Sequence, residues 1–274
     1  MDVIEKKQFW HQEMQRFDMK LSYVEITRDS PNNEYNSHVH PECEIYVNLS
    51  GDVSFMVENR IYPVLPGSIV ITRPYEYHHC IYHSNALHKH FWILFSPNGN
   101  EHLLSRFFDR PAGSGNLLLL PSDQQKALFD LCREMLDRED GALLRQYRFL
   151  KMLCLLESAT PAPTEVTSSY PDVDTALAYL EKHYALPITV SELAALSHVS
   201  VNTLERHFEA VLHLSPSVYL KKKRLGIAAE LLYRGATVSE ACRNSGFSDD
   251  SRFIALFKKT YGVTPLKYRE EVRK

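Results

Sequence analysis

An internal repeat in the last hundred residues constrains the fold more than any other feature of this sequence. The stretch 237–269 reads TVSEACRNSGFSDDSRFIALFKKTYGVTPLKYR, and a related stretch that begins forty-eight residues earlier reads TVSELAALSHVSVNTLERHFEAVLHLSPSVYLKK. A repeat of this length indicates one supersecondary unit used twice. Each copy opens with the Thr and Glu of a helix capping box, namely Thr189 with Glu192 and Thr237 with Glu240. We therefore expect two helix-turn-helix units, of which only the second has a turn glycine, Gly246.

The residues between the two units predict one continuous helix. Ser215-Pro216 is a helix start, and apolar residues follow at helical spacing as far as Leu232. Such a helix would hold the two units at a fixed separation. The basic run 221–224 near its beginning is compatible with phosphate contacts and equally with a solvated helix face.

The second helix of each unit is the candidate for entry into the major groove of DNA. Arg pairs with guanine, Asn with adenine, and small residues pack on thymine methyl groups. Taken alone, each outward face could simply be solvated, but the repetition favours DNA binding. The outward residues with such chemistry are Asn202, Thr203, Glu205 and Arg206 in the first unit, and Ser251, Arg252, Ala255 and Lys258 in the second.

The segments YLKKKRLGIAAELL and GFSDDSRFIALFKKTYGVTPLKYR are similar to the signature of the AraC/XylS family of bacterial transcription regulators, and the resemblance covers about 172–270. It implies that the base contacts fall on Asn202, Thr203, Glu205, Arg206, Ser251, Arg252 and Ala255. Ala255 is too short for a polar base contact, so the second unit relies on Arg252. We expect phosphate contacts from Ser200, Lys221, Lys222, Arg224, Ser248 and Lys258.

The region 20–96 predicts a β-domain. Its short apolar runs, EIYVNL, VSFMVE, GSIVIT and HFWILF, are rich in β-branched and aromatic residues and are separated by turn-forming sequences. Strands at this regular spacing, without an intervening helical pattern, indicate a sandwich or a small barrel.

Ligand-type side chains gather at the start of this β-domain. His38, His40 and Glu44 share one strand parity, so their side chains could converge, and His79 could join them from across the sheet. Imidazole and carboxylate groups suit zinc, nickel, manganese or iron. The same four residues together with Tyr46 suit a small polar effector, such as a sugar. A structural role at the barrel mouth is the third alternative.

The spacing of these residues, followed by Gly67, Pro74 and His79, resembles the two motifs of the cupin superfamily over about 30–95. Members of that superfamily often hold a divalent metal with three His and one Glu, which implies a metal on His38, His40, Glu44 and His79. The other histidines of the region are expected in solvated positions, namely His78, His83, His88 and His90.

Residues 121–158 predict a helical hairpin. Ser122 and Gln125 form a possible capping box for the first helix. The second helix places Leu143, Tyr147, Leu150 and Cys154 on one apolar stripe. Three further apolar residues lie off this stripe, namely Leu144, Met152 and Leu155. The hairpin either only covers the β-domain or also forms a dimer seam, and the surplus apolar residues favour the seam.

Length and charge suggest how the chain is divided. A chain of 274 residues predicts two domains. Residues 172–274 carry a net charge of +3 and the preceding residues −6, which permits DNA binding by the C-terminal part. We expect a β-domain over 1–120, the hairpin over 121–158, a Pro- and Thr-rich linker over 159–171, and an all-α domain over 172–274. The fold class is α+β multidomain.

The five scattered cysteines indicate neither a disulfide framework nor a thiolate zinc site, and no apolar run is long enough for a membrane span. We expect a soluble, cytoplasmic, effector-responsive regulator with no required cofactor. Its expected partners are double-stranded DNA, a small-molecule effector, RNA polymerase and a second copy of the chain.

Two other functions are open at this point. One is a metal-dependent cupin isomerase or dioxygenase with an appended helical domain, and the other is an architectural DNA-binding protein without a sensor. Activation and repression of transcription are both compatible with the sequence.

Overall fold

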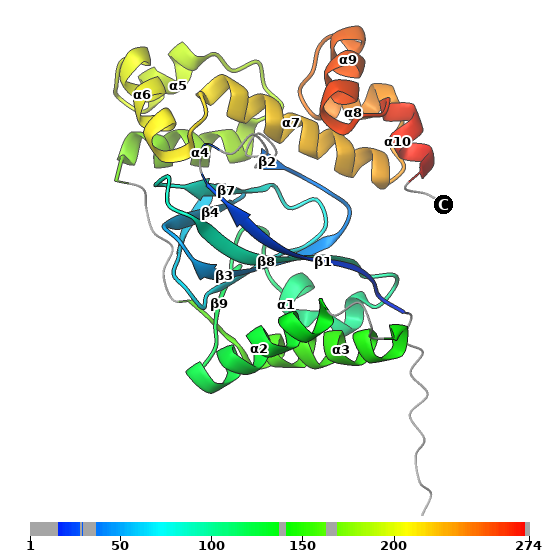
Figure 1. Ribbon diagram of the computed structural model, residues 1–274. Helices are drawn as coiled ribbons and strands as arrows, with labels where there is room; N and C mark the ends of the chain where they lie inside the picture. The colour runs from blue at the N-terminus through cyan, green and yellow to red at the C-terminus, as the bar shows by residue number, and fades with distance from the viewer. Residues whose placement is uncertain (1–15, 28, 30–36, 137–140, 163–168, 272–274) are drawn as a thin grey trace, which may run out of the picture.

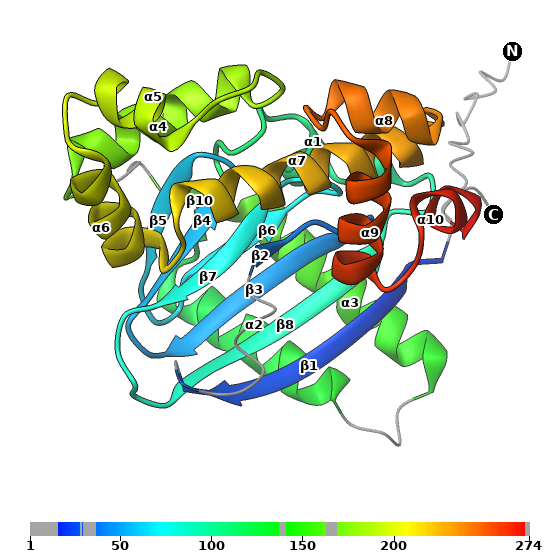
Figure 2. The same cartoon turned by 90° about the horizontal axis from the view of Figure 1, so that it is seen from above.

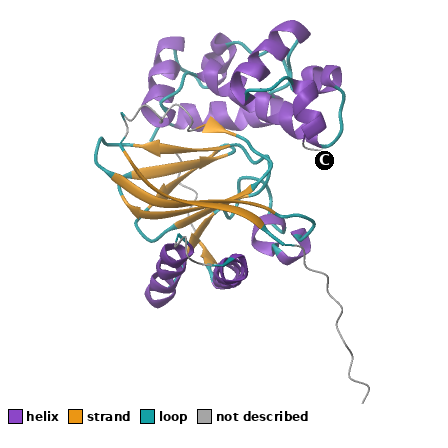
Figure 3. Ribbon diagram, turned by 45° about the vertical axis from the view of Figure 1, so that its right-hand side comes forward, coloured by secondary structure: helices purple, strands orange, loops and turns teal. Residues whose placement is uncertain are grey.

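The structure is a computed structural model that describes residues 16–27, 29, 37–136, 141–162 and 169–271. Its described elements form four layers (Figure 1). A pair of helices covers one β-sheet, a second sheet faces the first, and the C-terminal helices lie on the second sheet. Figure 3 shows the same order, with strands between two helical layers. The expected α+β organisation, with a β-sandwich region followed by an all-helical domain, is confirmed.

The two sheets are antiparallel at every pairing that the described strands make. The first sheet has the order β1 (Asp18–Ile26), β8 (His88–Ser96), β3 (Cys43–Ser50), β6 (Ile69–Thr72), β9 (Leu117–Leu119) and β10 (Thr160–Pro161). The second has the order β2 (Ser37–His38), β7 (His78–Tyr82), β4 (Val53–Val57) and β5 (Arg60–Val64).

Strand alternation assigns each side chain to a layer. In β3, Ile45 and Val47 join the apolar core beneath the helix pair, whereas Tyr46 points between the sheets and packs with Phe55 of β4. Tyr46 therefore lies on the interior face with Glu44, with which the sequence analysis grouped it. The same rule gives β7 one face toward the first sheet and one toward the C-terminal helices. Tyr82 packs in the apolar cluster between the sheets, and Ile81 packs in the cluster that the second sheet shares with the C-terminal helices.

The helix pair consists of α2 (Ser122–Met135) and α3 (Ala142–Ser158), with the short η2 (Glu101–Leu103) and α1 (Ser105–Phe108) before it. The predicted capping box is wrong, because Pro121 is the N-cap and Gln125 Nε2 donates to the Leu120 carbonyl at 2.7 Å. In α3 the buried residues are Phe149, Met152 and Leu156.

Most of the apolar stripe that the sequence predicts for α3 faces outward, whereas Leu150 of that stripe is half-buried against the core under the helix pair. Leu143 is 85% exposed, Tyr147 is 60% exposed, and Cys154 is also exposed. Two apolar stripes occupy this helix, and the sequence period alone does not decide which one meets the sheet. The stripe with Phe149 is inside because its ring packs edge-on against Phe17 and Phe95.

The first residues of the predicted linker belong to the sheet. Thr160 and Pro161 form β10 beside β9, and Ala159 is buried in the core under α2 and α3. Residues 163–168 lie outside the described part of the chain.

The C-terminal helices are α4 (Pro171–His183), α5 (Val190–Leu196), α6 (Val201–Leu212), α7 (Pro216–Tyr233), α8 (Val238–Asn244), α9 (Asp250–Tyr261) and α10 (Pro265–Glu271). Both predicted capping boxes are present, at the starts of α5 and α8. Ser215 caps α7, which runs unbroken between the units as expected.

The turns of the two units share one backbone conformation. Gly246 has φ +90° and His198, at the matching place of the first unit, has φ +56°. A Cβ on Gly246 would lie 2.8 Å from the Ala185 Cα and 2.9 Å from the Tyr184 carbonyl oxygen, so glycine is required there for space as well as for φ. Among the described residues, no helix is both long and apolar enough to cross a membrane.

The packing of α3 gives a stability prediction. We expect Phe149→Ala to lower the free energy of unfolding by about 3–5 kcal/mol, because it leaves a cavity between α3 and the first sheet. Leu143→Ala, on the exposed face of the same helix, should change it by less than about 0.5 kcal/mol. Urea denaturation followed by far-UV circular dichroism measures both; equal effects would contradict this orientation of α3.

Candidate functional site

Helices α6 and α9 lie at opposite ends of α7 (Figure 2). Each is the second helix of its helix-turn-helix unit, packed by a buried apolar stripe that includes Leu204 and Phe208 in α6 and Phe253 and Phe257 in α9. The β-domain does not cover the candidate base-reading residues. Of these, Asn202, Glu205, Arg206, Ser251, Arg252 and Ala255 are exposed and Thr203 is half-buried.

Helix α6 is fixed at its start and in its middle. The Ser200 hydroxyl accepts a hydrogen bond from the Thr203 amide, and the two hydroxyl groups lie 2.8 Å apart, so Thr203 is partly used by the helix cap. His207 Nδ1 lies 2.8 Å from Oδ2 of Asp172 in α4, and its ring stacks on Tyr170. These contacts orient α6 and leave Asn202 exposed, while the Arg206 guanidinium lies 3.5 Å from Nε2 of His207.

Helix α9 is fixed at its start by a side-chain cap. Its N-cap is Asp249, whose carboxylate accepts from the Arg252 amide at 3.0 Å. The Arg252 side chain is 90% exposed and lies 3.5 Å from Asp249 in a solvent-screened ion pair. Arg252 is therefore available to DNA, while Ser248 lies just before the cap and is exposed.

The expected phosphate contacts divide into two groups. Ser200, Ser248, Lys221 and Lys258 are exposed, and Lys222 is half-buried. Arg224 differs, because its guanidinium donates to the carbonyls of Tyr184 and Leu186 at 2.7 and 2.6 Å. It fastens the loop between α4 and α5 to α7, next to the turn of the second unit.

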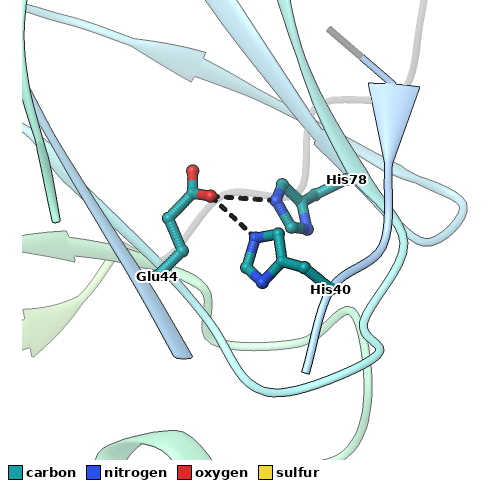
Figure 4. Close-up of side chains that lie close together, drawn as sticks. All are labelled: His40, Glu44 and His78. Carbon is teal, nitrogen blue, oxygen red and sulfur yellow. Dashed lines mark hydrogen bonds and ion pairs between the residues drawn. The ribbon is translucent and has the colours of Figure 1, made fainter. Parts of the chain in front are cut away.

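A polar cluster occupies the space between the two sheets (Figure 4). His40 Nε2 and His78 Nε2 lie 3.0 and 3.2 Å from the same oxygen, Oε2 of Glu44. Glu44 and His78 are buried and His40 is half-buried. Burial alone would raise the pKa of Glu44, but the charge of His78 and hydrogen bonds from both histidines hold that pKa well below its usual range.

The sequence selects the wrong histidine of β7 for this cluster. His78 is paired with His38 of the neighbouring strand β2, and its side chain faces Glu44. His79 is on the opposite face of β7, where its ring contacts Tyr77. Adjacent strand residues point to opposite sides, so only one of the two can face between the sheets. His79 is thus not brought to His40 and Glu44, and the side chain of His38 lies outside the described residues.

Other predicted polar residues line the same interior. The Tyr46 ring stacks on His90 with centroids 4.5 Å apart, and Asn48 donates from Nδ2 to the Val64 carbonyl at 2.8 Å. Burial lowers the pKa of His90 to about 4, so this imidazole is neutral near pH 7. The expected solvated positions are therefore wrong for His78, His88 and His90, which are buried, whereas His83 is exposed.

The two halves of the protein meet at a buried charge. Lys223 of α7 is 1% exposed, and its ammonium donates to Glu58 at 2.8 Å and to Glu181 of α4 at 2.7 Å. Glu58 lies in the β4–β5 turn and also accepts from the Tyr77 amide at 2.8 Å. Burial lowers the pKa of Lys223, but the two carboxylates more than compensate, so its pKa is raised above its usual value.

Three apolar contacts extend the interface between the β-domain and the C-terminal helices, which is called the seam below. Val39 packs so closely on α7 that a Cβ on Gly226 would lie 2.7 Å from it. The Tyr77 and Tyr219 rings meet edge-on at 5.5 Å, and Tyr75 joins the core of the second helix-turn-helix unit, 4.9 Å from Tyr233.

Sequence reasoning missed Lys223 and His78. The spacing of Tyr219, Lys223 and Gly226 is helical, which places Lys223 on the buried stripe of α7 and could have separated it from the rest of the basic run. No comparable signal distinguishes His78 from His79, because both are histidines in one strand.

Comparisons with known proteins find one family for the N-terminal half of the chain and another for the C-terminal half. Residues 23–153 match the AraC-like ligand binding domain family, and residues 193–271 match a helix-turn-helix domain family. The chain belongs to the AraC family. It is a DNA-binding transcription regulator with a ligand-binding domain, and since AraC-family proteins are regulators rather than enzymes, the alternative of a cupin enzyme is excluded.

Relatives of this AraC-family chain extend over nearly its whole length. The transcriptional activator RhaS of Klebsiella pneumoniae (strain 342) is 24% identical over 93% of this chain and 94% of its own. RhaS of Escherichia coli O1:K1 / APEC is 24% identical over 90% of this chain and 92% of its own. Among solved structures, ToxT from Vibrio cholerae O395 aligns with 94% of this chain and 98% of its own, at 13% identity and a TM-score of 0.39.

The buried ammonium at the seam gives a second prediction. Lys223→Met should lower the free energy of unfolding by about 3–5 kcal/mol, because it leaves Glu58 buried without its cation. Lys221→Met, an exposed position on the same helix, should change it by less than about 0.5 kcal/mol. The double variant Glu58→Gln, Lys223→Met should recover most of the loss. Urea denaturation provides the values, and a harmless Lys223→Met would show that the seam does not depend on this charge.

Proposed function

We propose that this regulator reads two successive major grooves on one face of the duplex through α6 and α9. The observation that carries the proposal is the placement of two exposed reading helices at the ends of one unbroken helix, α7. Base contacts come from Asn202, Thr203, Glu205 and Arg206 in α6 and from Ser251, Arg252 and Ala255 in α9. The expected half-site separation is roughly 34 Å, one turn of DNA.

Phosphate contacts position the protein on the duplex. Ser200 and Ser248 precede the two reading helices, and Lys221, Lys222 and Lys258 present cations nearby. Because these contacts release counterions, affinity should fall steeply as salt is raised. Arg224 is left out of this set, since its guanidinium is held by two backbone carbonyls.

Arg252 provides the test of base reading. We expect Arg252→Ala to weaken binding to the preferred site by about 1–3 kcal/mol and to relax preference at one base pair, because a bidentate contact to guanine is lost. The preferred site is obtained by repeated selection from random-sequence DNA with the unaltered protein. Fluorescence anisotropy on all its single-base-pair variants then gives the affinities.

Lys258→Ala is the matched control on the same helix. It should weaken binding by a similar factor on every sequence and reduce the salt slope by about 1. If Arg252→Ala gave this uniform pattern as well, Arg252 would be a phosphate contact and the base-reading role would be wrong.

We further propose that the chain is a homodimer that pairs through α3. The stripe with Leu143, Leu144 and Tyr147 is exposed on this helix, and Leu136, which follows the end of α2, is 38% exposed. A second copy offers the same stripe by symmetry, and a twofold helix pair would bury it. Dimerisation would place two pairs of reading helices on one operator.

Leu143→Glu should convert the dimer to a monomer, because it puts a carboxylate into the apolar centre of this contact. Leu65→Glu, which alters a leucine that is 70% exposed on the β-domain, should leave the dimer intact. Sedimentation velocity at several concentrations distinguishes the two. An unchanged sedimentation coefficient for Leu143→Glu would place the interface elsewhere.

The ligand of the sensor domain is proposed to be small and polar, for example sugar-like, and to bind near His40, Glu44 and Tyr46 between the sheets. Its binding would shift the population of arrangements of the two halves.

Activation, with RNA polymerase as the partner, is supported by the names of the RhaS relatives, which are transcriptional activators.

A further inference from the structure

The tautomers of His40 and His78 are set by the backbone. His40 Nδ1 lies 3.1 Å from the Glu42 carbonyl oxygen, and His78 Nδ1 lies 2.7 Å from the Glu76 carbonyl oxygen. A carbonyl oxygen only accepts hydrogen bonds, so each Nδ1 must carry the proton. In a neutral imidazole, Nε2 is then left with a lone pair and no hydrogen.

Both lone pairs meet a third acceptor. The two Nε2 atoms lie 3.0 and 3.2 Å from Oε2 of Glu44, and a carboxylate oxygen cannot donate. Two lone pairs that face the same carboxylate oxygen require positive charge between them and that oxygen. Either both imidazoles take an additional proton, with their ring centroids only 5.0 Å apart, or one divalent cation replaces the two protons. The cation avoids placing two like charges in this buried space.

The donor set fits a transition-metal ion. Two imidazole nitrogens and one carboxylate are the protein ligands of a zinc site that keeps an open position, and imidazole favours zinc, nickel or cobalt over magnesium or calcium. Ligands about 2.0–2.2 Å from one ion lie roughly 3.3 Å apart, and the three donor atoms here all lie within 4.8 Å of one another. The Nδ1–H groups bonded to carbonyls are the outer hydrogen bonds that orient metal-binding imidazoles.

We propose that His40, Glu44 and His78 bind one divalent transition-metal ion, and that its binding is transmitted to α7. The ligand set differs from the one expected from the sequence, since His78 replaces His79 and His38 is not required. This deepens the proposed sensor function, on which the second half of the inference rests.

The route to α7 consists of immediate neighbours of the two histidines. Val39, next to His40, packs on Gly226 of α7. Tyr77, next to His78, contacts Tyr219 of α7, and its amide holds Glu58, the partner of Lys223. The His40 carbonyl accepts from the Tyr75 amide at 2.9 Å, and Tyr75 packs into the second helix-turn-helix unit.

An ion that requires His40, Glu44 and His78 together therefore favours the arrangement in which β2 and β7 lie against α7. The stabilisation of this docked arrangement grows with ion concentration above the dissociation constant, as for any ligand that binds only one of two states. Occupancy would hold the two halves docked, and removal of the ion would release α7 and its reading helices for a different spacing.

The first experiment measures the ion alone on the full-length, chelator-treated protein. Co²⁺ titration should give visible d–d bands that saturate at one equivalent, and Zn²⁺ should abolish them. His78→Gln and Glu44→Gln should weaken Co²⁺ binding by more than about 100-fold, because even the loss of an outer hydrogen bond typically costs 10- to 100-fold. His79→Gln, the neighbour on the other face of β7, should bind normally. Circular dichroism verifies that each variant is folded.

Equal Co²⁺ affinity in His78→Gln, Glu44→Gln and the unaltered protein would overturn the metal site. So would saturation without visible bands. If His78→Gln did not fold, His40→Gln would take its place as the test of the imidazole ligands.

The second experiment measures the coupling. Hydrogen exchange of the α7 peptide that contains Tyr219 and Gly226 should slow at least tenfold with Zn²⁺ in the unaltered protein and in His79→Gln, but not in His78→Gln. A metal-bound protein whose α7 exchanges as fast as the metal-free form would overturn transmission. DNA binding by the metal-free protein is measured separately, so loss of the metal site and loss of DNA reading are distinguishable.

Discussion

The buried ammonium of Lys223 is the interaction on which the arrangement of this protein depends. An isolated charge at 1% exposure would be strongly destabilising, so Lys223 requires both Glu58 of the β-domain and Glu181 of α4. Lys223 and its two partners come from three separate segments of the chain. The ion pairs therefore specify one docking of α7 on the second sheet, while Val39 and the tyrosine contacts supply the apolar burial around it.

The seam and the polar cluster use opposite faces of the same strand. In β7, His78 faces Glu44 between the sheets, and the residues on either side of it, Tyr77 and His79, face the C-terminal helices. A strand is only one residue thick, so the sensor interior and the DNA-binding half are separated by a single backbone. The proposed transmission from the space between the sheets to α7 therefore needs no long pathway.

The C-terminal half was predictable from sequence because its signals are local. Capping boxes, the turn glycine and helical spacing each operate within a few residues, and the exposed residues of α6 and α9 follow from the same spacing. The β-domain was predictable only in outline. The selection of His78 over His79 depends on which strand pairs with β7 and in what register, and the inward stripe of α3 depends on the rings of Phe17 and Phe95. Those are non-local facts. The sandwich and the pairing of His40 with Glu44 could be predicted, but the histidine that β7 contributes to Glu44 could not.

The unbroken course of α7 has a consequence for the DNA that this regulator can use. Its 18 residues span about 27 Å at 1.5 Å per residue, and a hydrogen-bonded helix does not stretch. Arg224 adds a second restraint, because it fastens the α4–α5 loop beside the Gly246 turn. One base pair inserted between the half-sites rotates one of them by roughly 35° about the duplex axis. In the proposed mode of reading, the unbroken α7 would not follow this rotation, and the protein would act as a fixed ruler for operator phase.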